Sequence, residues 1–204
     1  MLTIKDLSVK FPSRFGDVTA IEDVDLKIRP GEIHGLVGES GAGKSTVGAA
    51  VIGLISTPGY IAKGEITLGD TDLRALTPEQ AHAVRGDRIS MIFQDPQTSL
   101  NPLMTVEDQL IETIQTHSAV SYAEAQNRAV DLLEEIGIKN AAERIKSYPH
   151  QFSGGMRQRV VIALALCTDP ELIIADEPTT ALDVAVQQQV LDLLRDLADR
   201  RNIA

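Results

Sequence analysis

Alternation of apolar and polar residues predicts β-strands in the first third of the chain. Between residues 2 and 11 every second or third residue is apolar, which is typical of a strand buried on one face. Residues 24–28 predict a second strand and residues 64–68 a third, and residues 12–19 are expected to form a loop. This part of the chain is therefore expected to be rich in strands.

Three short, mostly apolar runs predict strands of a different kind. They cover residues 32–37, 89–93 and 172–175. Apolar runs of this length, bounded by turn residues, are typical of strands buried in a core. Each run is followed directly by polar or glycine-rich sequence.

Helical periodicity dominates the second half of the chain. Thr77 and Pro78 predict a helix start, and between residues 106 and 147 there is no strand signal, which indicates a helical lobe set into an α/β core. Ser121 and Glu124 have the spacing of a capping box, and the last helix has an apolar face. The predicted helices cover residues 46–55, 106–117, 121–136, 153–167 and 184–201, and the apolar face of the last comprises Val190, Leu191, Leu194 and Leu197.

Composition narrows the class of protein. A net charge of −10 argues against a nucleic-acid-binding surface, which usually needs a basic stripe. The single cysteine, Cys167, excludes a disulfide framework within the chain and is expected to be inert. No apolar run approaches the roughly 18 residues that span a bilayer, so we expect a soluble, intracellular protein.

The strongest chemical signal is a phosphate-binding motif, G-x-x-x-x-G-K-[ST], between a predicted strand and a predicted helix. Such a loop points backbone N–H groups at a phosphate, and the helix N-terminus adds partial positive charge. The lysine would reach the β- and γ-phosphates and the serine hydroxyl would bind Mg²⁺. A simple glycine-rich turn is the alternative. The residues are Gly38, Glu39, Ser40, Gly41, Ala42, Gly43, Lys44, Ser45 and Thr46.

An acidic pair follows the apolar run at residues 172–175. Asp176 is predicted to join the Mg²⁺ shell, and Glu177 is predicted to polarise the attacking water. The alternative is an ordinary acidic turn at the end of a strand. The phosphate loop upstream favours the functional interpretation.

Three weaker signals gain meaning only in combination. Ser153 with Gly154 and Gly155 forms a second small-residue helix start that could face an anion. Gln94, after a predicted core strand, could sense Mg²⁺ or water through its amide. Phe15 could stack on adenine; Phe11 competes for that role, and core packing is the alternative for either ring.

Taken in order, these motifs resemble the ATP-binding subunit of ATP-binding-cassette (ABC) transporters. The sequences at residues 93–102 and 148–159 resemble most closely the importers of oligopeptides, dipeptides and nickel. The set of motifs comprises Phe15, residues 38–46, Gln94, Ser153 to Gly155, Asp176 with Glu177, and Ala181 to Asp183.

The resemblance implies the fold. We expect an α/β P-loop NTPase with a mostly parallel core sheet, an N-terminal antiparallel β-subdomain and an inserted helical lobe. Within one ATPase domain, residues 1–95 and 160–204 would form the nucleotide-binding core. Residues 96–159 would form the helical subdomain that carries the signature motif.

The resemblance also implies a mechanism shared by two chains. Two cassettes pair head to tail and enclose two ATP molecules, so that Lys44, Gln94 and Glu177 act on nucleotide within one chain. The Mg²⁺ ligands would be Ser45, Gln94 and Asp176. Ser153, Gly154 and Gly155 would bind the γ-phosphate of the ATP held by the partner cassette, and Asp183 would lie at the dimer seam.

The implied partners are membrane proteins. The second cassette would be an identical or a sister subunit, and two membrane permease subunits would dock near residues 94–102 at the cytoplasmic face of the cell membrane. A solute-binding protein would act indirectly, and no nucleic acid is expected. Selectivity would lie in the other subunits, so the sequence leaves peptide, nickel and oligosaccharide cargoes open.

One departure from the family pattern stands out. The family has a further core strand and a switch histidine after the last helix, beyond Ala204, and that strand would lie between those ending at Gly38 and Asp176. We therefore expect these 204 residues to be an N-terminal portion of a longer polypeptide. Two other functions compete with transport: a soluble ABC ATPase of DNA repair or translation, and a nucleotide-binding fragment deficient in hydrolysis.

Overall fold

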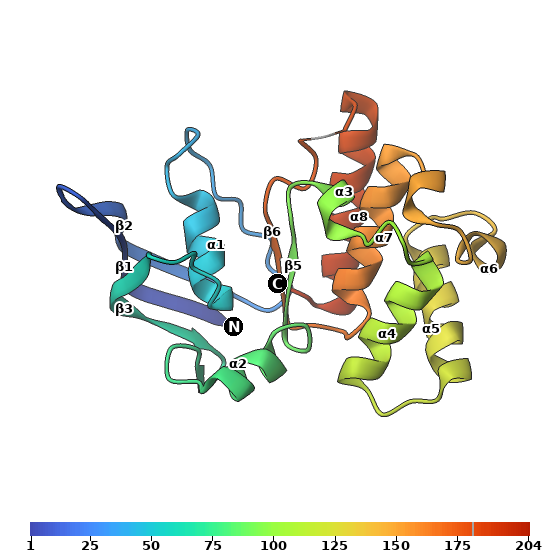
Figure 1. The fold of residues 1–204 in the computed structure, drawn as a ribbon, viewed down its shortest axis with the longest axis horizontal. Coiled ribbons are helices and arrows are strands. Elements are labelled where there is room, and N and C mark those ends of the chain that lie inside the picture. Colours follow the sequence, from blue (N-terminus) through green and yellow to red (C-terminus); the bar gives the residue numbers. More distant parts are fainter. Residues whose placement is uncertain (181) are drawn as a thin grey trace. The chain divides into compact units, whose positions relative to one another are not determined.

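The structure is a computed structural model that describes residues 1–180 and 182–204, without the side chain of Gln97. Ala181, one of the residues that carry the family resemblance, lies outside the described residues. The chain divides into two compact units, Met1–Arg85 with Ala204 and Gly86–Ile203. Figure 1 traces the chain through both units.

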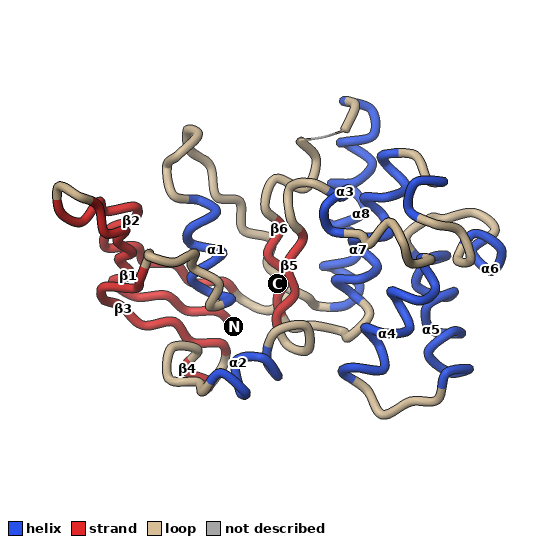
Figure 2. The backbone as a smooth tube through the Cα atoms, viewed as in Figure 1, coloured by secondary structure: helices blue, strands red, loops and turns tan. Residues whose placement is uncertain are grey.

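The first unit contains an antiparallel sheet with strand order β2-β1-β3-β4. Its strands are β1 (Leu2–Ser13), β2 (Gly16–Ile28), β3 (Tyr60–Leu68) and β4 (Thr71–Asp72), drawn in red in Figure 2. The three predicted strands are confirmed in position, and β2 and β3 are longer than their apolar patterns indicate. The predicted antiparallel sheet at the start of the chain is thus confirmed.

A bulge in β1 explains why its apolar residues do not alternate strictly. Leu2 and Ile4 face the core, and so do Leu7 and Val9, all at most 3% exposed. Asp6 between the two pairs has φ +49°, and the pairing register with β2 shifts between Ile4 and Leu7. The extra residue brings the second pair back onto the buried face.

The loop expected at residues 12–19 is wrong. β1 continues to Ser13 and β2 begins at Gly16, so only Arg14 and Phe15 connect them. Pro12 lies inside β1, opposite Asp17, beyond the last residue of β1 that pairs with β3. Within the described residues β1 has a single neighbour at that end, and proline is tolerated in edge positions of this kind.

The buried strand expected at residues 32–37 is also wrong. The segment is irregular, and its side chains Ile33 and Val37 are 59% and 98% exposed. A strand is stabilised by ladder hydrogen bonds to a neighbour. In the part of the chain that the structure describes, no strand pairs with this segment. Its apolar composition alone therefore does not make it a strand.

Two short helices complete the first unit. α1 (Lys44–Ile52) ends where Gly53 adopts a left-handed conformation, three residues before the predicted end. α2 (Pro78–Val84) begins as predicted: Pro78 is its first residue, and the hydroxyl of Thr77 accepts a hydrogen bond from the Gln80 N–H.

The second unit is built around two parallel strands. β5 (Ile89–Ile92) and β6 (Leu172–Ala175) pair in register from Ile89 opposite Leu172 to Ile92 opposite Ala175. Both strands were predicted from their apolar runs and are confirmed. The helices of this unit are α3 (Pro96–Ser99), α4 (Val106–His117), α5 (Tyr122–Glu135), α6 (Ala141–Arg144), α7 (Gly154–Leu166) and α8 (Val184–Arg201), with a 3₁₀ turn at Pro149–Gln151.

The helix predictions hold closely, with one correction at a cap. α4 and α8 have the predicted bounds. Ser121 caps α5 by accepting from the Glu124 N–H, but among the described residues the reciprocal bond of a capping box is not formed. The Glu124 carboxylate instead pairs with Arg128 one turn later, at 2.7 Å.

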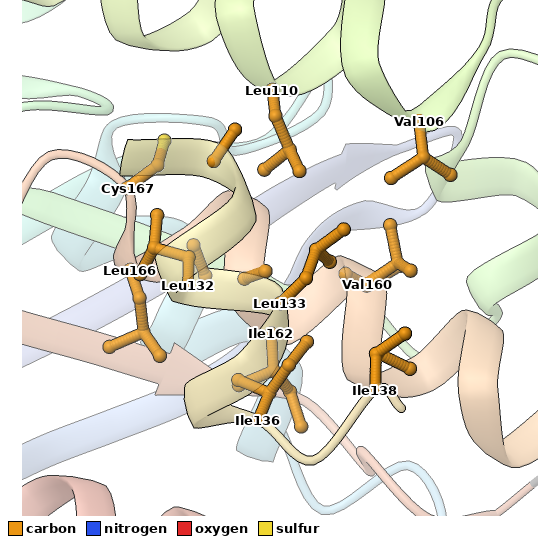
Figure 3. Close-up of a cluster of buried hydrophobic side chains, with 14 of the residues drawn as sticks. Val106, Leu110, Leu132, Leu133, Ile136, Ile138, Val160, Ile162, Leu166 and Cys167 are labelled. Atoms are coloured by element: carbon orange, nitrogen blue, oxygen red, sulfur yellow. The ribbon is translucent and has the colours of Figure 1, made fainter. Parts of the chain in front are cut away.

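Helices α4, α5, α7 and α8 share one apolar core. Figure 3 shows part of it, with Val106 and Leu110 of α4 facing Leu133 of α5 and Val160 of α7, all fully buried. The cluster continues to the last helix through Val190. Over residues 1–180 and 182–204, no helix combines the length and apolar character needed to cross a bilayer.

The apolar face predicted for α8 needs one correction. Val190 and Leu197 are buried and Leu194 packs against the core, but Leu191 is 47% exposed and Leu193 is buried in its place. Leu191 is displaced from Val190 by about 100° around the helix. Leu193 lies closer to the middle of the face that Val190, Leu194 and Leu197 define.

Candidate functional site

The phosphate loop belongs to the first unit and connects the irregular segment to α1. Gly43 occupies the N-cap position with φ +86°, and Gly41 has φ +81°. Glycine adopts this left-handed conformation without steric cost. The first N–H groups of a helix have no acceptor within the helix, so the start of α1 offers donors to an anion.

Gly43 lies directly against β2. A Cβ atom at this position would be 2.3 Å from Ile21 Cγ2 and 2.8 Å from the carbonyl oxygen of Ala20. The loop therefore has no space for a side chain there.

Lys44 lies folded over its own loop. Its Nζ donates to the carbonyl oxygens of Gly38 and Glu39, both at 2.9 Å. These are neutral acceptors, and an ammonium group forms stronger hydrogen bonds with a phosphate. The position of Lys44 is suited to exchange the two carbonyls for phosphate oxygens.

The two candidate aromatic residues differ in their surroundings. Phe15 lies at the turn between β1 and β2 and is 100% exposed. Phe11 lies within β1, and a Cβ added to Gly59 would be 2.4 Å from its ring. Phe11 thus packs against the chain, whereas the ring of Phe15 has both faces open.

In the second unit, Gln94 and Glu177 are brought together by the pairing of β5 with β6. The backbone N–H of Asp176 donates to Ile92 O at 2.9 Å and so extends the ladder by one residue. Just beyond it, Gln94 Nε2 donates to Glu177 Oε2 at 2.8 Å. Residues 83 positions apart in the sequence therefore share one hydrogen bond at the carboxyl ends of two parallel strands.

Thr180 was missed by the sequence analysis. Its hydroxyl donates to the same oxygen, Glu177 Oε2, at 3.0 Å. Glu177 has φ +48°, a conformation uncommon for a residue with a side chain, at the point where the chain leaves β6. Two neighbouring threonines follow Glu177, and nothing in the sequence distinguishes the one that binds it.

Ser45 in the first unit, and Gln94 and Asp176 in the second, each carry a side-chain oxygen of the kind that Mg²⁺ takes as a ligand. The ion takes oxygen ligands, and in nucleotide sites it is usually bound through one or two carboxylates, together with phosphates and water. Gln94 donates through Nε2, which leaves its Oε1 as a candidate ligand. In the described part of the chain no three His, Cys, Asp or Glu side chains are grouped as a protein-only metal site would require.

Ser153, Gly154 and Gly155 form the start of α7, also in the second unit. Ser153 is exposed and is the N-cap, and its hydroxyl oxygen accepts from the Met156 N–H at 3.3 Å. A hydroxyl that accepts in this way retains its own proton for donation. The start of α7 therefore presents an O–H group and a helix N-terminus.

Asp183 and the start of α7 line the same pocket, which has a volume of about 290 Å³. Asp183 is the N-cap of α8, yet within the described residues its carboxylate caps no N–H of that helix. The loop before it is held by Thr179, whose carbonyl oxygen accepts from Leu182 N–H and from Gln187 Nε2. The structure thus brings together Ser153, both glycines and Asp183.

Cys167 does not belong to any of these groups. It lies buried at the end of α7, and burial raises the pKa of its thiol to about 12. The thiol stays protonated at neutral pH and is a poor nucleophile.

Known proteins match the chain along most of its length. The sequence profile of the family described as "ABC transporter" matches residues 21–180. The "Oligopeptide transport ATP-binding protein OppD" of Bacillus subtilis is 50% identical over 97% of this chain and 55% of its own length. The protein of the same name from Salmonella typhimurium is 48% identical over 100% of this chain and 61% of its own length. The "Dipeptide transport ATP-binding protein DppD" of Escherichia coli is 42% identical over 100% of this chain and 62% of its own length.

Solved structures match as well. The dimeric structure of a post-hydrolysis state of the ATP-binding cassette MJ0796 bound to ADP and Pi has a TM-score of 0.85 and 28% identity, over 99% of this chain and 84% of that one. Another dimeric structure of MJ0796, described as a bacterial ABC transporter cassette, also has a TM-score of 0.85. The chain spans 55–62% of the length of the three curated relatives named above.

Proposed function

The chain belongs to the ABC transporter family, and from this premise we propose that it is the ATP-binding and ATP-hydrolysing subunit of an importer for peptides or a related small solute. The observation that carries the proposal is the hydrogen bond from Gln94 to Glu177, which holds a carboxylate at the ends of β5 and β6. The relatives named for oligopeptide and dipeptide transport support the class of solute.

In this proposal the phosphate loop binds ATP together with three residues outside it. The backbone N–H groups at the start of α1 surround the phosphates, and Lys44 moves its hydrogen bonds from two carbonyl oxygens to the β- and γ-phosphates. Ser45 of the first unit, together with Gln94 and Asp176 of the second, would hold Mg²⁺, which would neutralise charge on the phosphates. The open ring of Phe15 stacks on adenine.

Glu177 acts on the attacking water. Gln94 and Thr180 both donate to Oε2, which fixes the orientation of the carboxylate and leaves Oε1 to accept a proton from water. Glu177 is therefore the proposed catalytic base. Gln94, which touches both the base and the proposed Mg²⁺ shell, links nucleotide binding to the base.

Hydrolysis requires a second cassette in this proposal. Ser153 and the N-terminus of α7 contact the γ-phosphate of ATP held by a head-to-tail partner, identical or sister, and Asp183 lies at the seam between them. The dimeric cassette structures support this arrangement. Loss of the γ-phosphate removes the anion that both halves share, so the halves part and drive two permease subunits at the cytoplasmic face of the membrane.

Turnover by a Glu177→Gln variant tests the proposal. In the full-length protein, purified with its membrane subunits, we expect ATP binding to remain and hydrolysis to fall by about 10²–10⁴-fold, because the amide cannot accept the proton. Hydrolysis at the wild-type rate would remove Glu177 from its role. Uptake of a labelled peptide by cells that carry the wild-type or the variant protein tests the solute class, and co-purification of nucleic acid instead of membrane proteins would contradict transport.

A further inference from the structure

The two glycines of the signature segment have different surroundings. A Cβ atom added to Gly154 would have its nearest neighbour, Leu182 Cδ2, at 3.8 Å, an ordinary van der Waals contact. A Cβ atom added to Gly155 would lie 2.6 Å from Val186 Cγ1. α8 thus approaches α7 too closely at Gly155 for any side chain to fit.

Val186 lies in the first turn of α8, three residues after the proposed seam residue Asp183. Its backbone N–H donates to Asp183 O at 2.9 Å, and its side chain packs against the core of the second unit. Valine is confined to essentially one χ1 rotamer in a helix, so its methyl group cannot turn away from α7. Because the backbone of Val186 is bonded to Asp183, a shift of this turn of α8 moves both residues.

We propose that Gly155 is a positioning residue: its missing side chain lets α8 approach α7 closely at Val186, and this close approach permits the spacing between the signature segment and Asp183. The inference rests on the proposed function, in which both groups face the partner cassette. They line a single pocket of about 290 Å³. Ordinary contact begins at 3.4 Å, so a methyl group at Gly155 would push the helix starts apart by most of an ångström.

A competing explanation assigns Gly155 a different requirement. Glycine at a phosphate site can be needed because the ligand approaches the backbone closely. On that explanation an added methyl group meets the phosphate, and the residue at position 186 is irrelevant. On ours, the methyl group meets Val186, and shortening that side chain removes the obstacle.

A rescue experiment separates the two explanations. Gly155→Ala, Val186→Ala and the double variant are made in the full-length protein with its membrane subunits, and ATP turnover is measured. ATP-dependent pairing of cassettes is measured in parallel by size-exclusion chromatography in a Glu177→Gln background, so that this readout does not need hydrolysis. Gly154→Ala, with and without Val186→Ala, is the matched control.

We expect Gly155→Ala to lower turnover and pairing affinity by about 100-fold, since a displacement near 1 Å in a site can have an effect of that size. Turnover and pairing affinity of Val186→Ala alone should stay within about threefold of the wild-type values. Those of the double variant should recover to within about fivefold of wild type. Val186→Ala should give Gly154→Ala no benefit, because Gly154 does not face Val186.

The inference is overturned if Gly155→Ala behaves like wild type, or if the double variant recovers neither turnover nor pairing. If Gly155→Ala alone fails to fold, as judged by thermal unfolding, the double variant still decides, because relief at Val186 must restore both folding and pairing. Failure of the proposed function has a different outcome: the wild-type protein would neither hydrolyse ATP nor pair in its presence.

Discussion

Two glycine-rich helix starts, one in each unit, carry residues proposed to contact phosphate, and neither has space for a side chain at one glycine. At Gly43, before α1, the space is taken by Ile21 Cγ2 and by the backbone oxygen of Ala20. At Gly155, in α7, it is taken by the side chain of Val186. The first start therefore meets backbone as well as a side chain, and the second meets a side chain alone.

This difference predicts at which positions of the proposed site a harmful substitution can be compensated by a second one. A backbone contact cannot be relieved by changing a neighbouring residue, whereas a side-chain contact can. The two helix starts also differ in capping. Within the described residues Gly43 gives α1 no side-chain cap, whereas Ser153 caps α7 through its hydroxyl. We expect the phosphate loop to be intolerant of change and the α7–α8 region to accept compensated changes.

The largest effect is expected at Gly43. Gly43→Ala should weaken ATP binding by about 100-fold or more, because the new methyl group meets β2 and the left-handed conformation disfavours alanine. A second substitution, Ile21→Ala, should not restore binding, since the oxygen of Ala20 remains 2.8 Å from the methyl position. Titration with a fluorescent ATP analogue measures both variants.

Gly41→Ala is the matched control for this prediction. Gly41 has φ +81°, but among the described atoms none lies within 4 Å of its Cβ position. Its substitution should cost only the conformational strain of about 1–2 kcal/mol, which corresponds to roughly five- to thirtyfold weaker binding at most. Recovery of the Gly43→Ala variant by Ile21→Ala would abolish the contrast between the two helix starts.

A smaller effect is expected in the loop that joins β6 to α8. Thr180→Ala should lower kcat about tenfold with little change in KM, because Glu177 loses one of two hydrogen bonds that orient it. Thr180→Ser should have a kcat close to that of wild type, because serine keeps the hydroxyl that donates to Glu177. Steady-state ATPase kinetics measures kcat and KM separately.

Thr179→Ala provides the control, since Thr179 braces the loop through its backbone carbonyl. It should change kcat by less than about twofold. If Thr180→Ala and Thr180→Ser lowered kcat equally, the hydroxyl would not orient Glu177. The close approach of Gly155 to Val186 would then be the remaining place in the second unit where we expect a side chain to position the proposed site.

Much of the helical structure was predictable because its signals are local. The bounds of α4 and α8 follow from apolar period, and the start of α2 follows from Thr77 and Pro78. The strand expected at residues 32–37 failed because a strand depends on a neighbour that its own sequence does not specify. The early loop failed for the same reason, since pairing with β2 extended β1 through Pro12.

Residue types at the site were predictable, but their contacts were not. The spacing around Lys44 and the acidic pair at Asp176 are sequence motifs. The bond between Gln94 and Glu177 arises from the pairing of β5 with β6. The contact of Gly155 with Val186 depends on how two helices pack. Neither contact has a local signal.

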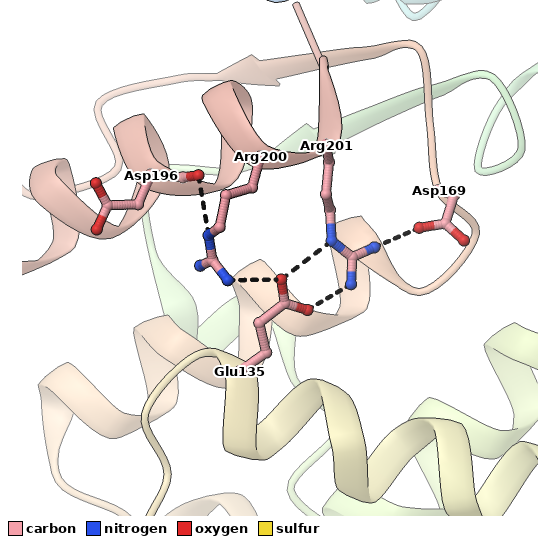
Figure 4. A network of polar contacts seen from close by, with 5 residues as sticks. All are labelled: Glu135, Asp169, Asp196, Arg200 and Arg201. Carbon is pink, nitrogen blue, oxygen red and sulfur yellow. Dashed lines mark hydrogen bonds and ion pairs between the residues drawn. The ribbon is translucent and has the colours of Figure 1, made fainter.

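The smallest effect on stability is expected at the C-terminal end of α8. It tests whether only the first turn of this helix positions the signature segment. At the other end of that helix, Arg201 pairs with Glu135 of α5 and with Asp169, and Arg200 Nη1 lies 3.4 Å from Glu135 Oε1 (Figure 4). The hydrogen bond from Arg201 holds the pKa of the Glu135 carboxyl below its usual value of 4.5. A carboxyl whose pKa is lowered on folding stabilises the protein above the unfolded pKa and ceases to do so as the pH falls through the folded value.

Glu135→Gln should therefore lower the free energy of unfolding by about 1 kcal/mol at pH 7, and the difference from wild type should shrink as the pH falls below about 4.5. Denaturant unfolding at several pH values measures this. Glu124→Gln removes an exposed pair on the same helix and should cost no more than about 0.5 kcal/mol. ATP turnover should be unchanged at pH 7, because this network lies at the opposite end of α8 from Val186. A loss of turnover that parallels the loss of stability would show that the whole length of α8, and not its first turn alone, positions the signature segment.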